Sequence, residues 1–100
     1  MDQEPRLSYA SLKVLRAFAD SPTQKLCGAE VHRLTKVSIG TLYPILFRFE
    51  EAGWLDSEWE DIDPKEAKRP RKRFYWLTRT GLTRASQVLA SIGAQVPAWA

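Results

Sequence analysis

Apolar residues recur at intervals of three and four residues in four stretches of the chain, which predicts four amphipathic helices. The first covers residues 9–20 and is capped by Ser8, whose hydroxyl can accept a bond from an unpaired backbone N–H. A short second helix covers residues 28–36, and the last runs from residue 79 or 80 to residue 95. The expected inward-facing residues are Leu12, Val14, Leu15, Phe18 and Ala19 in the first helix, and Val31, Leu34 and Val37 in and after the second.

The third helix follows the second almost at once, beginning between Ser38 and Thr41 and ending at Gly53. Pro44 has no N–H to donate, so either the helix begins late, with Thr41 as its N-cap, or it bends at the proline. Gly53 followed by Trp54 predicts a Schellman stop, which a left-handed glycine and an apolar contact close. The expected buried face comprises Leu42, Ile45, Leu46 and Phe49.

Beyond this helix the period of the pattern changes from about 3.6 residues to two, which predicts β-strands. Residues 55–59 form the first strand and the aromatic-rich residues 73–78 form the second. The polar residues 61–72 between them include two prolines, and we expect no regular structure there. The two strands and their loop therefore make a long hairpin.

Three helices followed by a hairpin, with a very short link between the second and third helices, make a winged helix-turn-helix. We predict a mainly α fold with a small β-hairpin (α+β), with residues 1–78 forming a DNA-binding domain and residues 79–100 a C-terminal dimerisation helix. Together they would form a single compact domain. The last helix has a heptad pattern typical of a helix–helix interface, although the same stripe could pack on its own domain. The stripe comprises Leu82, Ala85, Leu89, Ile92 and Val96.

The composition of the chain limits the classes of function that the protein can have. The 100 residues carry a net charge of +3, a mild sign of a polyanionic partner. No apolar run approaches the ~20 residues of a membrane span, and the polar N-terminus does not resemble a signal peptide, so we expect a cytoplasmic protein. Cys27 is the only cysteine and His32 the only histidine; we interpret them as a packed thiol and a surface imidazole. With no nucleophile–base pair, metal-ligand spacing or phosphate loop, we expect no enzyme, no metal and no cofactor.

The opening of the third helix is suited to DNA. Its unpaired N–H groups carry partial positive charge, and the hydroxyls of Ser38 and Thr41 can donate to phosphates. Gly40 has no side chain, so the DNA backbone could come close, and Tyr43 would project from the first turn. These four residues are the predicted DNA contacts of the helix.

Three segments resemble the PadR family of winged-helix transcriptional regulators. Residues 38–55 are similar to its recognition-helix signature, a serine, Gly-Thr-Leu-Tyr-Pro, and a Leu-x-Arg-Leu-Glu run ending in glycine. Residues 26–31 resemble its Leu-x-Gly-x-Glu-Ile, and residues 70–78 with Gly81 resemble its Pro-Arg-Arg-Lys-Tyr-Tyr-x-Leu-Thr and following glycine. The resemblance implies a homodimeric repressor that joins through its C-terminal helix and binds double-stranded DNA at a palindromic operator. Many relatives are released by small aromatic effectors, so it also implies such a ligand.

The hairpin loop and second strand are basic, and the resemblance places them in the wing. Phosphate contacts are predicted there for Lys68, Arg69, Arg71 and Lys72. The competing interpretation is local, because the first strand is acidic and its glutamates, Glu58 and Glu60, could pair across the hairpin with Arg71 and Arg73. Lys68 and Arg69 at the loop tip are the preferred DNA contacts, since no acidic partner is fixed for them.

The chain departs from the family pattern at two aromatic positions, Phe47 and Trp76, and at Ile39, and its wing is longer than usual. On the second strand Tyr75 and Leu77 share one face, and we expect Tyr75 in the core. An alternative function follows, a protein–protein interaction module that uses an apolar patch around Phe47 and Trp76.

Overall fold

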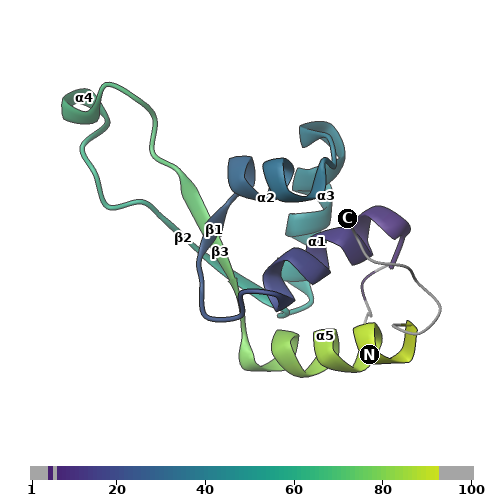
Figure 1. Ribbon diagram of the computed structural model, residues 1–100. Coiled ribbons are helices and arrows are strands. Elements are labelled where there is room, and N and C mark those ends of the chain that lie inside the picture. Colours follow the sequence, from purple (N-terminus) through teal and green to yellow (C-terminus); the bar gives the residue numbers. More distant parts are fainter. Residues whose placement is uncertain (1–4, 6, 93–100) are drawn as a thin grey trace.

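Three helices form the body of the molecule, and a small antiparallel sheet lies along one side of them (Figure 1). The computed structural model describes Pro5 and residues 7–92. In chain order the elements are α1 (Tyr9–Ala19), β1 (Leu26–Cys27), α2 (Gly28–Thr35), α3 (Ile39–Glu51), β2 (Leu55–Trp59), α4 (Pro64–Ala67), β3 (Arg73–Leu77) and α5 (Arg79–Ile92). Three helices, a hairpin and a last helix confirm the predicted α+β winged-helix fold. None of these helices has the length and apolar character that a membrane crossing requires.

The core lies where α1, α2 and α3 meet the sheet, and local signals account for most of it. The hydroxyl of Ser8 accepts a hydrogen bond from the backbone N–H of Ser11 at 3.1 Å, which confirms the predicted cap. Leu34, predicted to face inward, is instead 53% exposed. The buried side of α2 follows Gly28, Val31 and Thr35, and this stripe leaves Leu34 at its edge. The largest fully buried side chains are Phe18, Phe49, Leu15, Leu42, Leu46, Leu55, Val14 and Val31.

Helix α3 begins early and ends as predicted. Ser38 is its N-cap residue, so the late start at Thr41 is wrong, and Pro44 lies inside the helix. Gly53 has a φ of 80°, and the N–H of Trp54 donates to the carbonyl of Phe49 at 2.9 Å. The rings of Phe49 and Trp54 stack with centroids 5.5 Å apart. This is the predicted Schellman stop with its apolar closure.

The sheet has the strand order β1-β3-β2, with both pairings antiparallel. The sequence predicts only the hairpin of β2 and β3. It does not predict β1, because a strand of two residues is too short to show an alternating pattern. Tyr75 pairs with Ser57 on one side and with Leu26 on the other. Tyr75 and Leu77 are buried, as predicted, and this face of β3 closes the core.

The connection between β2 and β3 projects away from the body and ends in the one-turn helix α4 (Figure 1). The prediction that residues 61–72 lack regular structure is therefore wrong. Asp63 caps this turn by accepting a bond from the N–H of Lys65 at 2.9 Å, and Pro64 takes the first helical position. Proline is well suited there, because the first N–H of a helix has no intrahelical partner.

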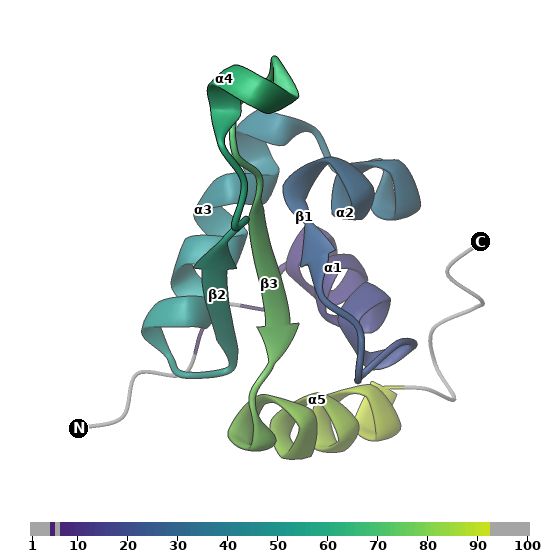
Figure 2. The same ribbon diagram turned by 90° about the vertical axis from the view of Figure 1, so that its left-hand side faces the viewer.

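Helix α5 packs across α1 at the base of the molecule, below the sheet in Figure 2. Its N-cap is Thr78, whose hydroxyl oxygen accepts from the N–H of Gly81 at 2.9 Å and donates to the carbonyl of Gly53 at 2.6 Å. A Cβ added at Gly81 would lie 2.7 Å from the carbonyl carbon of Trp54, so only glycine allows this approach. The start of α5 is thus fixed to the turn that ends α3.

Candidate nucleic-acid interface

The first turn of α3 is exposed at the end of the molecule from which the wing projects (Figure 2). Ser38, Gly40 and Thr41 are all exposed, and the Ser38 hydroxyl donates to that of Thr41 at 3.2 Å. A Cβ at Gly40 would meet nothing within 4 Å, so the fold does not require glycine there. The turn therefore offers two hydroxyls and an open stretch of backbone to a ligand.

Tyr43 stands one turn further along and is held against the start of α2. Its side chain is 45% exposed, and its ring lies over Gly28, where a Cβ would come within 2.7 Å of the Tyr43 Cζ atom. Gly28 is a residue whose role sequence reasoning missed. The signal that could have pointed to this role is the position of Gly28 at the start of a helix, in the segment that resembles the Leu-x-Gly-x-Glu-Ile motif. Its lack of a side chain sets where Tyr43 sits.

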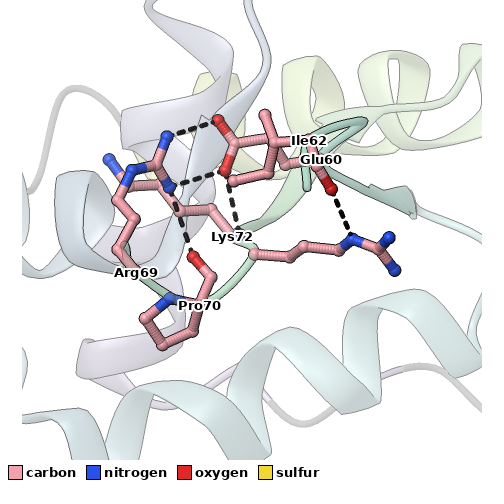
Figure 3. A network of polar contacts seen from close by, with 6 residues as sticks. Glu60, Ile62, Arg69, Pro70 and Lys72 are labelled. Carbon is pink, nitrogen blue, oxygen red and sulfur yellow. Dashed lines mark hydrogen bonds and ion pairs between the residues drawn. The ribbon is translucent and has the colours of Figure 1, made fainter. Parts of the chain in front are cut away.

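Near the wing tip, Glu60 binds Arg69 through two hydrogen bonds, from Nη1 to Oε1 at 2.7 Å and from Nη2 to Oε2 at 2.9 Å (Figure 3). The backbone N–H of Lys72 donates to the same carboxylate at 3.2 Å. The guanidinium of Arg69 is the main cause that lowers the pKa of Glu60 to about 2, and Glu60 in turn raises the pKa of Arg69. The expectation that Arg69 has no fixed acidic partner is wrong, because the long loop folds it back onto the strand end.

The predicted ion pairs of Glu58 and Glu60 with Arg71 and Arg73 do not form. The strand register places Glu58 opposite Phe74, and Glu58 pairs with Lys25 at 2.8 Å. The Arg71 Nε donates to the carbonyl of Ile62 at 3.0 Å. Acidic side chains therefore do not neutralise Arg71 in the way that the sequence suggested.

The wing carries three further basic residues, namely Arg73 on β3, Lys65 in α4 and Lys68 at the C-cap of α4. Arg73 lies 3.6 Å from Glu50 and stacks over the ring of Trp59 at 5.0 Å. Within the described part of the chain, no hydrogen bond or ion pair engages the ammonium groups of Lys65 and Lys68. Lys68 is thus available at the wing tip, as predicted.

A groove of about 430 Å³ runs between the start of α2, α3 and the wing. Gly28 and Tyr43 of the helices and Arg71 and Lys72 of the wing are among the residues that line it. Burial raises the pKa of Tyr75, which lies in the same groove. The structure thus brings three predicted DNA contacts, Tyr43, Arg71 and Lys72, to one basic groove. Ser38, Gly40 and Thr41 are exposed on the adjoining turn of α3, while Lys68 and Arg69 lie further out on the wing.

Phe47 and Trp76 do not form a common patch. Phe47 is 62% exposed on α3 and shares a hollow with Tyr75. Trp76 is the next residue on β3, so it points to the other face of the sheet, where the ammonium of Lys25 lies 4.6 Å from its ring. The interaction module suggested by these two residues lacks a single surface.

The predicted dimerisation stripe is divided by the packing of α5. Ala85 is fully buried in its own subunit, whereas Leu82 is exposed and Leu89 and Ile92 are half-buried. Val96, the end of the stripe, lies outside the described residues.

The single cysteine and the single histidine of the chain lie in different surroundings. Cys27 is buried, and His32 is exposed with its Nδ1 atom 2.7 Å from the carbonyl oxygen of Val37. In Pro5 and residues 7–92, no cluster of three or more histidine, cysteine or acidic residues could hold a metal ion.

Comparison with known proteins supplies an independent observation. The model of the transcriptional regulator PadR-like family matches residues 24–87. Disulfide-formed AbfR, a protein of Staphylococcus epidermidis, superposes with a TM-score of 0.72 at 24% identity, over 91% of this chain and 61% of that one. Apo MarR from E. coli gives 0.70 at 20% identity, over 89% and 60%. A PadR-family regulator from Eggerthella lenta DSM 2243 gives 0.66 at 22% identity, over 82% and 72%.

These structural likenesses establish the fold. The chain spans about three fifths of the length of AbfR and MarR. Both of those proteins have also been solved with DNA, AbfR in an overoxidized form and MarR as a mutant in complex with operator DNA. A comparison with curated protein sequences gave no match.

Proposed function

Because the chain belongs to the PadR-like family of transcriptional regulators, we propose that it binds a palindromic operator as a dimeric, sequence-specific repressor. Members of this family are DNA-binding regulators rather than enzymes. One observation carries the proposal, namely that the exposed first turn of α3 adjoins a groove walled by Arg71 and Lys72. A turn of exposed backbone and a basic wall together match a duplex, in which phosphates flank the bases of the major groove.

In this proposal the residues divide by what they contact. The hydroxyls of Ser38 and Thr41 donate to phosphate oxygens, and Gly40 lets the backbone approach the duplex. Tyr43 follows on the same helix. The wing contacts a neighbouring phosphate run through Lys68, Arg71, Lys72 and the donors of Arg69 that Glu60 leaves unused.

The dimer would form through α5. Because Ala85 holds this helix on its own subunit, the contact would use the exposed Leu82 with the half-buried Leu89 and Ile92, continued by Val96. Two α3 helices about 34 Å apart would then meet successive turns of the operator. A small aromatic effector near this interface is part of the proposal, and it rests on the resemblance alone.

Fluorescence anisotropy on duplexes from the protein's own promoter region tests the DNA-binding proposal. We expect tighter binding than to random duplexes and a steep loss of affinity as salt rises. Lys72→Gln should weaken binding to all sequences and reduce the salt slope by about 1. The control Lys13→Gln removes the same charge on α1, which does not line the groove, and should leave binding unchanged. Equal affinity for promoter and random DNA, or no salt dependence, would contradict the proposal.

Light scattering tests the dimer, which should have twice the chain mass of 11.4 kDa. Leu82→Glu places a charge on the proposed interface and should give monomers. Leu34→Glu places the same charge on an exposed leucine of α2 and should leave the mass unchanged. A monomeric wild-type protein, or a dimer that survives Leu82→Glu, would argue against an interface through α5.

A further inference from the structure

The exposed face of α3 has almost no side chains that form base-specific hydrogen bonds. The exposed residues of its first nine positions are Ile39, Gly40, Thr41, Tyr43, Pro44 and Phe47. Direct recognition of bases by hydrogen bonds chiefly uses arginine, lysine, asparagine, glutamine and acidic residues, and serine or threonine can add single bonds. Of these residue types the stretch carries only Thr41. The first charged residue of the helix is Arg48, beyond this stretch. Sequence recognition by this stretch must therefore rely mainly on another kind of contact.

What the face offers instead is apolar surface. Ile39, Tyr43 and Phe47 follow one another at intervals of four residues, so they lie along one side of the helix. Ile39 is 44% exposed, and Phe47 is more exposed than either of the other two. The three side chains span about 12 Å along the helix axis. That length corresponds to about three or four base pairs of a duplex.

The charges around this apolar row favour a duplex as its occupant. The adjoining groove has Arg71 and Lys72 on its wall, which attract a polyanion. Glu50, near the other end of the helix, accepts a bond from the Ser57 hydroxyl at 2.6 Å and lies near Arg73. Arg48 is exposed and can still bind a phosphate, whereas the exposed Glu51 would repel one, so the contact should end before Glu51. The one apolar group on a base in the major groove is the C5 methyl of thymine.

We propose that Ile39, Tyr43 and Phe47 contact thymine methyl groups in the major groove, so that the operator carries A·T pairs where α3 faces it. This inference rests on the proposed DNA-binding function and specifies what its recognition helix distinguishes. Phe47 thereby acquires a role in specificity, since the fold itself leaves it exposed.

Replacing single thymines by deoxyuridine tests the proposal, because the change removes only the methyl group. The operator is first obtained by selection from random duplexes, and each thymine is then replaced in turn. The wild-type protein should lose about fourfold in affinity at each position where one methyl is buried. In the Phe47→Ala variant the loss at the position nearest Phe47 should disappear, while losses elsewhere remain. Leu34→Ala, an exposed leucine outside α3, should retain the whole wild-type profile.

Three results would overturn the proposal, and they differ in what else they exclude. An operator that is bound specifically but tolerates deoxyuridine at every position excludes contact with thymine methyls and leaves the DNA-binding function intact. Failure to select any sequence excludes both. A loss of affinity on deoxyuridine substitution that is the same in Phe47→Ala and Ile39→Ala as in the wild type would also overturn it, because other residues would then contact the methyl groups.

Discussion

Replacing Gly81 by alanine should destabilise the fold through a contact with the turn that ends α3. The new Cβ would lie 2.7 Å from the carbonyl carbon of Trp54 and 2.9 Å from its Cα, well inside the 3.4 Å at which ordinary contact begins. The obstacle is backbone rather than the end of a flexible side chain. The first turn of α5 must therefore move away from Trp54.

The size of the effect follows from what this movement breaks. Crowding a close-packed site destabilises by about 1–3 kcal/mol, and loss of the bond from the Gly81 N–H to Thr78 removes about 1 kcal/mol more. Alanine recovers about 1 kcal/mol through its higher helix propensity. The net loss in the free energy of unfolding is about 2 kcal/mol. For a chain of this size, that corresponds to a fall in Tm of about 8–16 °C.

Urea denaturation followed by circular dichroism measures the change, and the midpoint should fall at an unchanged m-value. Gly40→Ala is the matched control, because a Cβ there meets nothing within 4 Å and the helix gains up to about 1 kcal/mol. The same substitution should thus have opposite signs at the two positions. If Gly81→Ala is as stable as the wild type, the close approach of α5 to Trp54 is not a structural requirement.

Three further predictions concern the wing and helix α3. The Glu60 carboxyl should titrate near pH 2 by NMR, and Arg69→Gln should return its pKa towards 4.5. Because folding lowers this pKa, the contact stabilises the fold above about pH 4.5 and is lost as the pH falls through about 2; a normal titration in the wild type would contradict it. Gly28→Ala should displace Tyr43 and weaken DNA binding, with little further loss in a Tyr43→Ala background; additive losses would speak against the contact. Pro44→Ala should raise the free energy of unfolding by about 1–3 kcal/mol in urea denaturation, since it restores a helix hydrogen bond; an unchanged midpoint would show that the proline is not a local strain.

Most of the fold could be predicted because its signals are local. Ser8, Gly53 and the apolar period of α3 each act within one or two helical turns, and all three predictions are confirmed. The prediction that Leu34 faces inward is wrong, because the elements packed against a two-turn helix decide which of its sides is buried. The sequence pattern does not predict α4, although Asp63 and Pro64 form its cap and its first position, because the two prolines of residues 61–72 indicate irregular structure.

The candidate site was harder to predict because its geometry is set across the chain. The partner of Arg69 is nine residues away along a folded-back loop, and the pairing of Glu58 with Lys25 spans 33 residues. Neither follows from counting charges on two strands. The contact of Gly28 with Tyr43 likewise joins two helices, and only the packed structure reveals it.

The joint between α3 and α5 has a mechanical consequence. The N–H of Thr78 donates to the carbonyl of Trp54 at 3.0 Å, and the Thr78 hydroxyl donates to the carbonyl of Gly53 at 2.6 Å. Both bonds fasten the N-cap of α5 to the turn that ends α3. With Gly81 seated directly against the same backbone, this joint has little freedom to pivot. In a dimer joined through α5, a rotation of one subunit against the other would carry its α3 along as a rigid lever. The spacing between the two α3 helices would then be set at the joint rather than at the surface proposed to contact DNA.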